Sequence, residues 1–80
     1  MTIREEAIEA LVKKANQLFG EGEYGPDTRF VEDLQAKSVD MVKFCALLED
    51  VFEVEVPFME MTRKQTFADA AAFIGQMFGE

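Results

Sequence analysis

SVDMVKFCALLEDVFEVEVP, residues 38–57, holds the strongest helical pattern in the chain and also the point at which that pattern ends. Apolar residues recur there every three or four positions, which is typical of the buried face of a helix. This row consists of Val42, Cys45, Leu48 and Phe52. Three more apolar residues widen it, as expected for a helix packed on two sides: Phe44, Leu47 and Val51. Val54, Val56 and Pro57 favour extended backbone, so we expect a helix over about 38–53.

A second helix is predicted at the start of the chain, over about 2–19. Thr2 with Glu5 three residues later forms the pattern of a capping box. Apolar residues follow at helical spacing, and Gly20 stands where a glycine would end the helix.

The last part of the sequence predicts one more main helix and a short one. Thr66 with Asp69 marks an N-cap, followed by apolar residues that predict a helix over about 67–78. Between Pro57 and this cap, residues 58–64 favour a short irregular helix. No segment has the pattern of a strand, so the fold class is all-α, a small four-helix bundle.

The segment 20–37 is predicted to be a long loop. It contains three glycines and a Gly25-Pro26 pair, and no helical period extends through it. We expect Phe30, Val31 and Leu34 to anchor it in the core, and Asp27-Thr28 to start a short turn.

Composition limits the possible functions. Eighty residues predict a single domain, residues 1–80, with a small core. A net charge of −8 repels phosphates, so nucleic-acid binding and membrane insertion are not expected. One cysteine permits no internal disulfide and fits a reducing compartment, and no apolar run approaches the roughly 20 residues of a membrane span. We expect a cytoplasmic monomer.

Ser38 is the main candidate for a functional residue. It is the only serine in the chain and lies where the long loop meets the helix. A hydroxyl at that position suits covalent attachment of a group, and it equally suits a plain N-cap. The residues themselves leave both readings open.

The sequence resembles the acyl carrier protein family over nearly its whole length. Four stretches carry the resemblance: residues 27–34 (DTRFVEDL), 38–42 (SVDMV), 47–57 (LLEDVFEVEVP) and 66–70 (TFADA). The resemblance implies that 4′-phosphopantetheine is esterified to Ser38 and carries acyl intermediates as thioesters, in fatty-acid, polyketide or related biosynthesis. It also implies as partners a phosphopantetheinyl transferase and acyl-processing enzymes of acyltransferase, ligase or ketosynthase type.

The chain departs from this family around the attachment serine. Lys37-Ser38-Val39 replaces the usual Asp-Ser-Leu, and Lys43 and Val51 stand where acidic residues are usual. Lysines weaken an acidic recognition surface, which suggests a specialised carrier with its own partners. The expected partner-binding residues are Lys37, Val39, Asp40, Val42, Lys43, Ala46, Glu49, Asp50 and Met59.

Two alternatives to an acyl carrier stay open at this point. One is a carrier-like interaction domain that is never modified, with Ser38 as a cap. The other is an aminoacyl or peptidyl carrier of a nonribosomal pathway. An enzyme is not expected, because the chain has no histidine to activate a nucleophile.

Several other residue types have a structural reading. Cys45 lies on the apolar row and is expected to be a buried thiol. The acidic residues of the long loop lack the ligand spacing of a calcium loop, so no metal site is predicted. Phe58, Met59 and Met61 are expected in the core, or else in an acyl pocket or docking patch.

Overall fold

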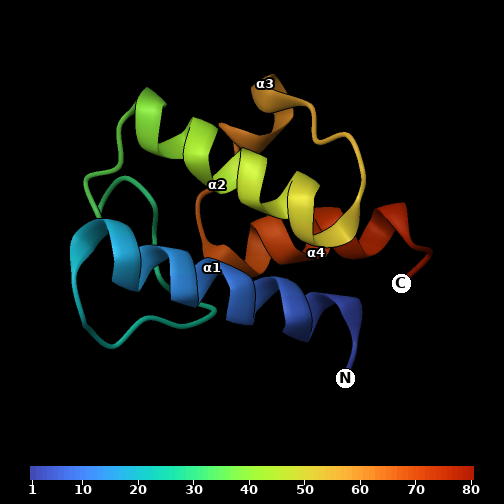
Figure 1. Cartoon of the computed structure of the whole chain (residues 1–80), viewed down its shortest axis with the longest axis horizontal. Helices are drawn as coiled ribbons and strands as arrows, with labels where there is room; N and C mark the ends of the chain where they lie inside the picture. Colours follow the sequence, from blue (N-terminus) through green and yellow to red (C-terminus); the bar gives the residue numbers. More distant parts are fainter.

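The protein is described by a computed structural model that covers residues 1–80, and it folds into four helices (Figure 1). These are α1 (Ile3–Phe19), α2 (Ser38–Phe52), α3 (Phe58–Met61) and α4 (Phe67–Met77). No strand is present, and the one backbone bridge joins Arg29 and Thr66. In Figure 1, α1 lies beside α2 and α4, while α3 lies against α2. The all-α, four-helix architecture predicted from the sequence is confirmed.

The helix bounds agree with the predicted ones to within one residue, except at α3. Helix α2 stops at Phe52 because Glu53 adopts a left-handed backbone with φ 54°. Helix α3 is shorter than the predicted 58–64 and ends at Met61, after a single turn. The beginning of α2 at Ser38 is as predicted.

Both predicted threonine caps are present. The Thr2 hydroxyl accepts the Glu5 N–H at 3.1 Å, and the Glu5 carboxylate accepts the Thr2 N–H at 2.9 Å. Thr66 accepts the Asp69 N–H at 3.1 Å in the same way at the start of α4. Because these bonds satisfy N–H groups that have no partner inside a helix, they fix where α1 and α4 begin.

A group of phenylalanines forms the centre of the core. The ring of Phe30, from the long loop, lies 5.2 Å from that of Phe44 and 5.0 Å from that of Phe67. Small buried residues, Ala7 on α1 and Ala70 on α4, allow those two helices to approach closely. The loop is therefore tied into the bundle by this aromatic side chain and also by backbone bonds, from the Phe30 N–H to the Gln65 carbonyl and from the Phe67 N–H to the Thr28 carbonyl.

One predicted loop anchor is wrong. Phe30 and Leu34 are buried, but Val31 is 67% exposed. Backbone bonds from Asp33 to Arg29 and from Gln35 to Val31 wind this part of the loop into a helical turn. Residues four apart then share a face, so Phe30 and Leu34 point inward together and Val31 points outward.

The buried face of α2 is also rotated from the predicted row. Its buried residues are Met41, Phe44, Cys45 and Leu48. Val42 is 51% exposed and Phe52 is only partly buried. Helix α2 packs on α1 through one flank and on α3 through another, so the buried face is centred between the two neighbours and Val42 lies at its edge.

The two ends of the chain meet at the start of α1 (Figure 1). The Glu80 carboxylate accepts the Ile3 N–H at 2.7 Å and the Arg4 N–H at 3.3 Å. An acidic side chain there complements the positive end of the helix dipole. None of the four helices is long and apolar enough to cross a membrane.

Candidate functional site

Ser38 is the first residue of α2, and its side chain is exposed to solvent. The N-cap position belongs to Lys37, so the reading of Ser38 as a helix cap is wrong. Lysine has no acceptor atom with which to cap, and the Asp40 carboxylate instead accepts the Lys37 N–H at 2.9 Å. No hydrogen bond to the protein holds the Ser38 hydroxyl, which leaves its oxygen available for a covalent bond.

The backbone around Ser38 favours negative charge. The first N–H groups of a helix have no partner within it, and the dipole adds partial positive charge at that end. Lys37, also exposed, adds a full positive charge beside the serine. A phosphodiester on the Ser38 oxygen would lie next to these groups, and they would stabilise it.

An apolar cavity opens on the same side of α2. It has a volume of about 350 Å³ and lies between α2 and the segment that contains α3. Its lining consists of Val42, Cys45, Ala46, Glu49, Val56 and Phe58. Val42 is four residues after Ser38, which places both on one face of the helix. The serine therefore stands at the end of the row of α2 residues that lines the cavity.

Two polar contacts hold the wall of this cavity. The Glu49 carboxylate accepts the Val56 N–H at 2.9 Å, and the Cys45 thiol donates to the Val56 carbonyl oxygen at 3.3 Å. These bonds join α2 to the chain just before α3, across the bend that Pro57 completes. One wall of the cavity is therefore the short segment around Val56, which these two bonds hold in place, rather than a long helix.

Cys45 is a buried thiol, as the sequence predicted. Burial, and secondarily the negative charge of Glu49, raises the pKa of the Cys45 thiol above its ordinary value. The thiol form persists at neutral pH, so Cys45 is a poor nucleophile and acts as an apolar part of the cavity wall.

Most of the predicted partner surface is exposed. Its exposed members are Lys37, Val39, Val42, Lys43, Ala46, Asp50 and Met59. Asp40 and Glu49 are partly buried, and their carboxylates hold backbone N–H groups of this chain. These two carboxylates therefore support the local structure of α2, and a partner would find them already engaged.

The residues from the start of α3 separate into three environments. Met61 is fully buried, Phe58 is partly buried and lines the cavity, and Met59 is 68% exposed. The expectation that they act together, as core or as patch, is corrected, because consecutive positions of one helical turn face different directions. Val56 was missed as a wall residue, since only the bend after α2 brings it over Cys45.

Acidic and thiol groups do not gather into a metal site. No group of three or more histidine, cysteine, aspartate or glutamate side chains is arranged to hold a metal ion. Two acidic residues of the loop instead pair with Arg29, which lies within 3.2 Å of Asp33 and also pairs with Glu32.

Comparison with known proteins agrees with this geometry. The family model described as "Phosphopantetheine attachment site" matches residues 6–74. An acyl carrier protein of Helicobacter hepaticus is 34% identical over 73 residues, which cover 91% of this chain and 88% of that protein. Acyl carrier proteins of Akkermansia muciniphila and Borreliella burgdorferi are 40% and 39% identical, over 66% and 74% of both chains respectively.

Proposed function

This chain belongs to the acyl carrier protein family, and we propose that Ser38 is the residue that bears its covalently attached 4′-phosphopantetheine. The protein carries acyl groups for acyl biosynthesis. The thiol of the bound group supplies the chemistry, because it holds the acyl group as a thioester. The family consists of carriers rather than catalysts, and we extend that description to this chain.

One observation carries the assignment to Ser38. Its hydroxyl is exposed, is the only serine hydroxyl of the chain, and has no structural bond to lose. Asp40 accepts the Lys37 N–H just before α2 and Ser38 makes no side-chain bond there, so local helix formation gives no reason for a serine at position 38. This argues against the alternative of a carrier-like interaction domain that is never modified, in which Ser38 serves only as the helix cap.

The cavity beside Ser38 supports an acyl cargo. Its apolar wall begins one turn after the serine, at Val42, and continues to Ala46 and Phe58. A short acyl chain attached through the arm would find apolar surface there, with Cys45 uncharged at neutral pH. An aminoacyl cargo, with a charged ammonium group, would find one carboxylate in this wall, and that carboxylate, of Glu49, already holds the Val56 N–H.

The proposed partners are a phosphopantetheinyl transferase and acyl-processing enzymes of acyltransferase, ligase or ketosynthase type. They would meet the exposed face around Ser38, which combines Val39 and Val42 with the charges of Lys43 and Asp50. We propose that the chain acts as a monomer in the cytoplasm, where its single free thiol stays reduced.

Intact mass measurement tests the assignment. The purified chain is incubated with coenzyme A and a broad-specificity phosphopantetheinyl transferase. The Ser38 oxygen gains one bond to phosphorus, the pyrophosphate bond of coenzyme A breaks, and 3′,5′-ADP leaves. Wild type is expected to gain the mass of one 4′-phosphopantetheine, and Ser38→Ala to gain none.

Thr66→Ala is the matched control, because it removes a hydroxyl at the start of α4 instead of α2. It should be modified at the wild-type extent. A modified Ser38→Ala protein, or an unmodified wild type under conditions that load a known carrier, would overturn the assignment.

A further inference from the structure

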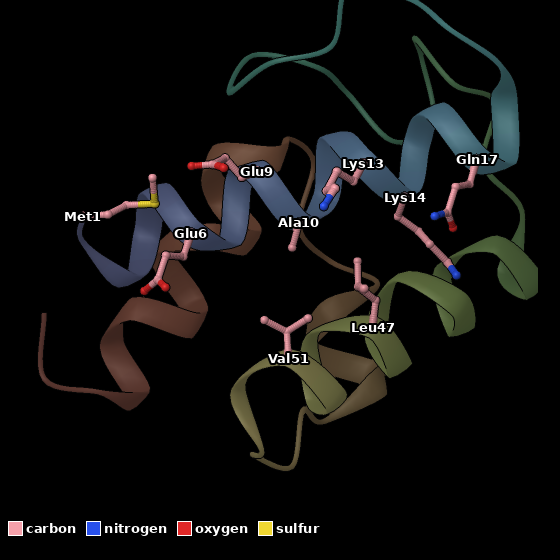
Figure 2. A pocket seen from close by; sticks show the side chains of 9 residues that line it. All are labelled: Met1, Glu6, Glu9, Ala10, Lys13, Lys14, Gln17, Leu47 and Val51. Carbon is pink, nitrogen blue, oxygen red and sulfur yellow. The ribbon is translucent and has the colours of Figure 1, made fainter.

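A second groove runs along the side of α2 that faces α1. It has a volume of about 420 Å³, larger than the cavity near Ser38. Ala10 from α1 faces Leu47 and Val51 from α2 across it (Figure 2). Val51 remains 49% exposed there, so the groove has an aliphatic floor that the bundle itself does not cover.

This groove lies on the opposite side of α2 from the attachment face. Leu47 is nine residues after Ser38, so at 3.6 residues per turn it lies about 180° around the helix axis. The two apolar surfaces of α2 therefore point toward different neighbours, α1 and α3. A molecule held in this groove would leave Ser38 and the cavity near it uncovered.

Charges are sorted along the α1 wall of the groove. Glu6 and Glu9 precede Ala10, while Lys13 and Lys14 follow it. In Figure 2, Glu6 lies at the Val51 end of the groove and Lys14 extends over the other end, beside Gln17. The groove thus has one acidic end, an aliphatic centre and one basic end.

We propose that this groove, lined by Ala10, Leu47 and Val51, docks an amphipathic helix from a partner protein. The helix would place an aliphatic side chain over Val51, a basic residue beside Glu6 and an acidic residue beside Lys14. Charge complementarity of this kind fixes the orientation of a bound helix and speeds association. The inference does not depend on modification at Ser38.

A second copy of this chain suits the groove less well. Two copies, each with a net charge of −8, repel one another on approach. A stable interface buries about 1,200 Å² or more, whereas the apolar lining here consists of four side chains, those of Met1, Ala10, Leu47 and Val51. The size and charge of the groove instead fit a transient contact with a different protein.

The test uses a defined helical peptide as the probe and the full chain labelled with ¹⁵N. The peptide carries one central leucine, two lysines one turn before it and two glutamates one turn after it. Amide shifts on titration are expected at Ala10, Leu47 and Val51, with residues around Val42 unaffected. A second peptide with glutamates at both ends should bind several-fold more weakly, because Glu6 and Glu9 repel it.

Matched pairs of variants locate the binding surface. Val51→Asp should weaken binding roughly tenfold, whereas Val31→Asp, at another exposed valine, should leave it unchanged. Lys13→Glu should weaken binding of the mixed-charge peptide, because its glutamates then face a carboxylate, and Arg63→Glu, with the same change in net charge, should not. Each variant is first checked for a folded amide spectrum.

Three outcomes of the peptide titrations would overturn the proposal. They are no saturable shift, shifts centred on Val42 and Met59, and equal affinities for Val51→Asp and Val31→Asp. Concentration-dependent shifts of the groove residues without peptide would assign the groove to a second copy and equally reject the partner helix. Ser38→Ala should bind the peptide as wild type does, so failure of loading and failure of docking are told apart.

Discussion

The two halves of this bundle are built by different means. The packed half, α1 with α4 and the aromatic core, begins both helices with threonine capping boxes and buries alanines where the helices meet. The cavity half, α2 with α3, has no side-chain cap at Lys37 and only one turn of helix in α3. The proposed attachment site lies in the half with the fewest fixed contacts, where space for a cargo remains. Stability and carrying capacity are thereby separated within 80 residues.

Truncating one phenylalanine in each half should give the largest contrast. Phe67 is fully buried against Phe30, so Phe67→Ala should lower the free energy of unfolding by about 3–5 kcal/mol. Phe58 is partly buried beside an existing cavity, and Phe58→Ala should lower it by less than about 2 kcal/mol. Urea unfolding at low temperature measures both. Equal losses would mean that the cavity half is packed as firmly as the core.

Removing the hydroxyl at the start of α4 or of α2 should give a smaller difference in the free energy of unfolding than the phenylalanine truncations do. Thr66→Ala should lower the free energy of unfolding by about 0.5–2 kcal/mol, because it frees the Asp69 N–H. Ser38→Ala should change it by less than about 0.5 kcal/mol, because the exposed Ser38 hydroxyl makes no hydrogen bond that would be lost. The two variants are compared by urea unfolding. A Ser38→Ala loss as large as that of Thr66→Ala would restore the serine as a structural cap.

The charges around Ser38 should alter loading rather than folding. Lys37→Asp combined with Lys43→Glu should speed modification several-fold with a transferase that prefers acidic carriers, chiefly through association. The gain should shrink at high salt, since screening shortens the reach of exposed charges. Loading rates of wild type and variant are measured at low and high salt. Equal rates in both buffers would show that the lysines are ordinary solvated charges.

Changes of pH should have the smallest effects on stability. Acid should act on the packed half and alkali on the cavity half. Hydrogen bonds from Thr2 lower the pKa of Glu5 below its ordinary 4.5, so its contribution is present above pH 4.5 and disappears as pH falls through the lowered pKa. Burial, then Glu49, raises the pKa of Cys45 above 9.0, so that contribution is complete below pH 9.0 and disappears as pH rises.

Melting curves of single variants test this division. Glu5→Gln keeps the capping geometry and should reduce the slope on the acid side alone, where the lowered pKa of Asp33, held by hydrogen bonds from Arg29, supplies a further part. Cys45→Ala should reduce the slope on the alkaline side alone. A difference between wild type and Cys45→Ala that stays constant above pH 9.0 would contradict the assignment to the thiol.

Local signals in the sequence were sufficient for the helix starts and the fold class. Thr2 and Thr66 each meet their partner three residues later, so the bonds that begin α1 and α4 involve only neighbouring residues. Cys45 was also predicted correctly, because it lies near the centre of the apolar face of α2. The resemblance to acyl carrier proteins, which the comparisons confirm, likewise rests on short stretches in a fixed order.

The errors arose where packing between distant segments decides the outcome. Val31 and Val42 are apolar residues close to buried ones in the sequence, yet each lies just outside the face that its neighbours cover. Val56 becomes a cavity wall only because Glu49 accepts its N–H from the preceding helix. The groove of Ala10, Leu47 and Val51 combines two helices separated by the long loop, and no periodicity within either helix predicts it.

The contact of Glu80 with the Ile3 and Arg4 N–H groups brings the two chain ends within reach of each other. Neighbouring ends make a fold amenable to circular permutation, with a short linker joining the old ends and new ones opened in an exposed loop. Exposed Glu21 and Glu23 offer such an opening, since they lie between α1 and the turn that starts near Pro26. In the rearranged order, the helix that bears Ser38 would precede α1 in synthesis. Loading of such a permuted chain would show that a transferase recognises the fold of the carrier and not the order of its helices along the chain.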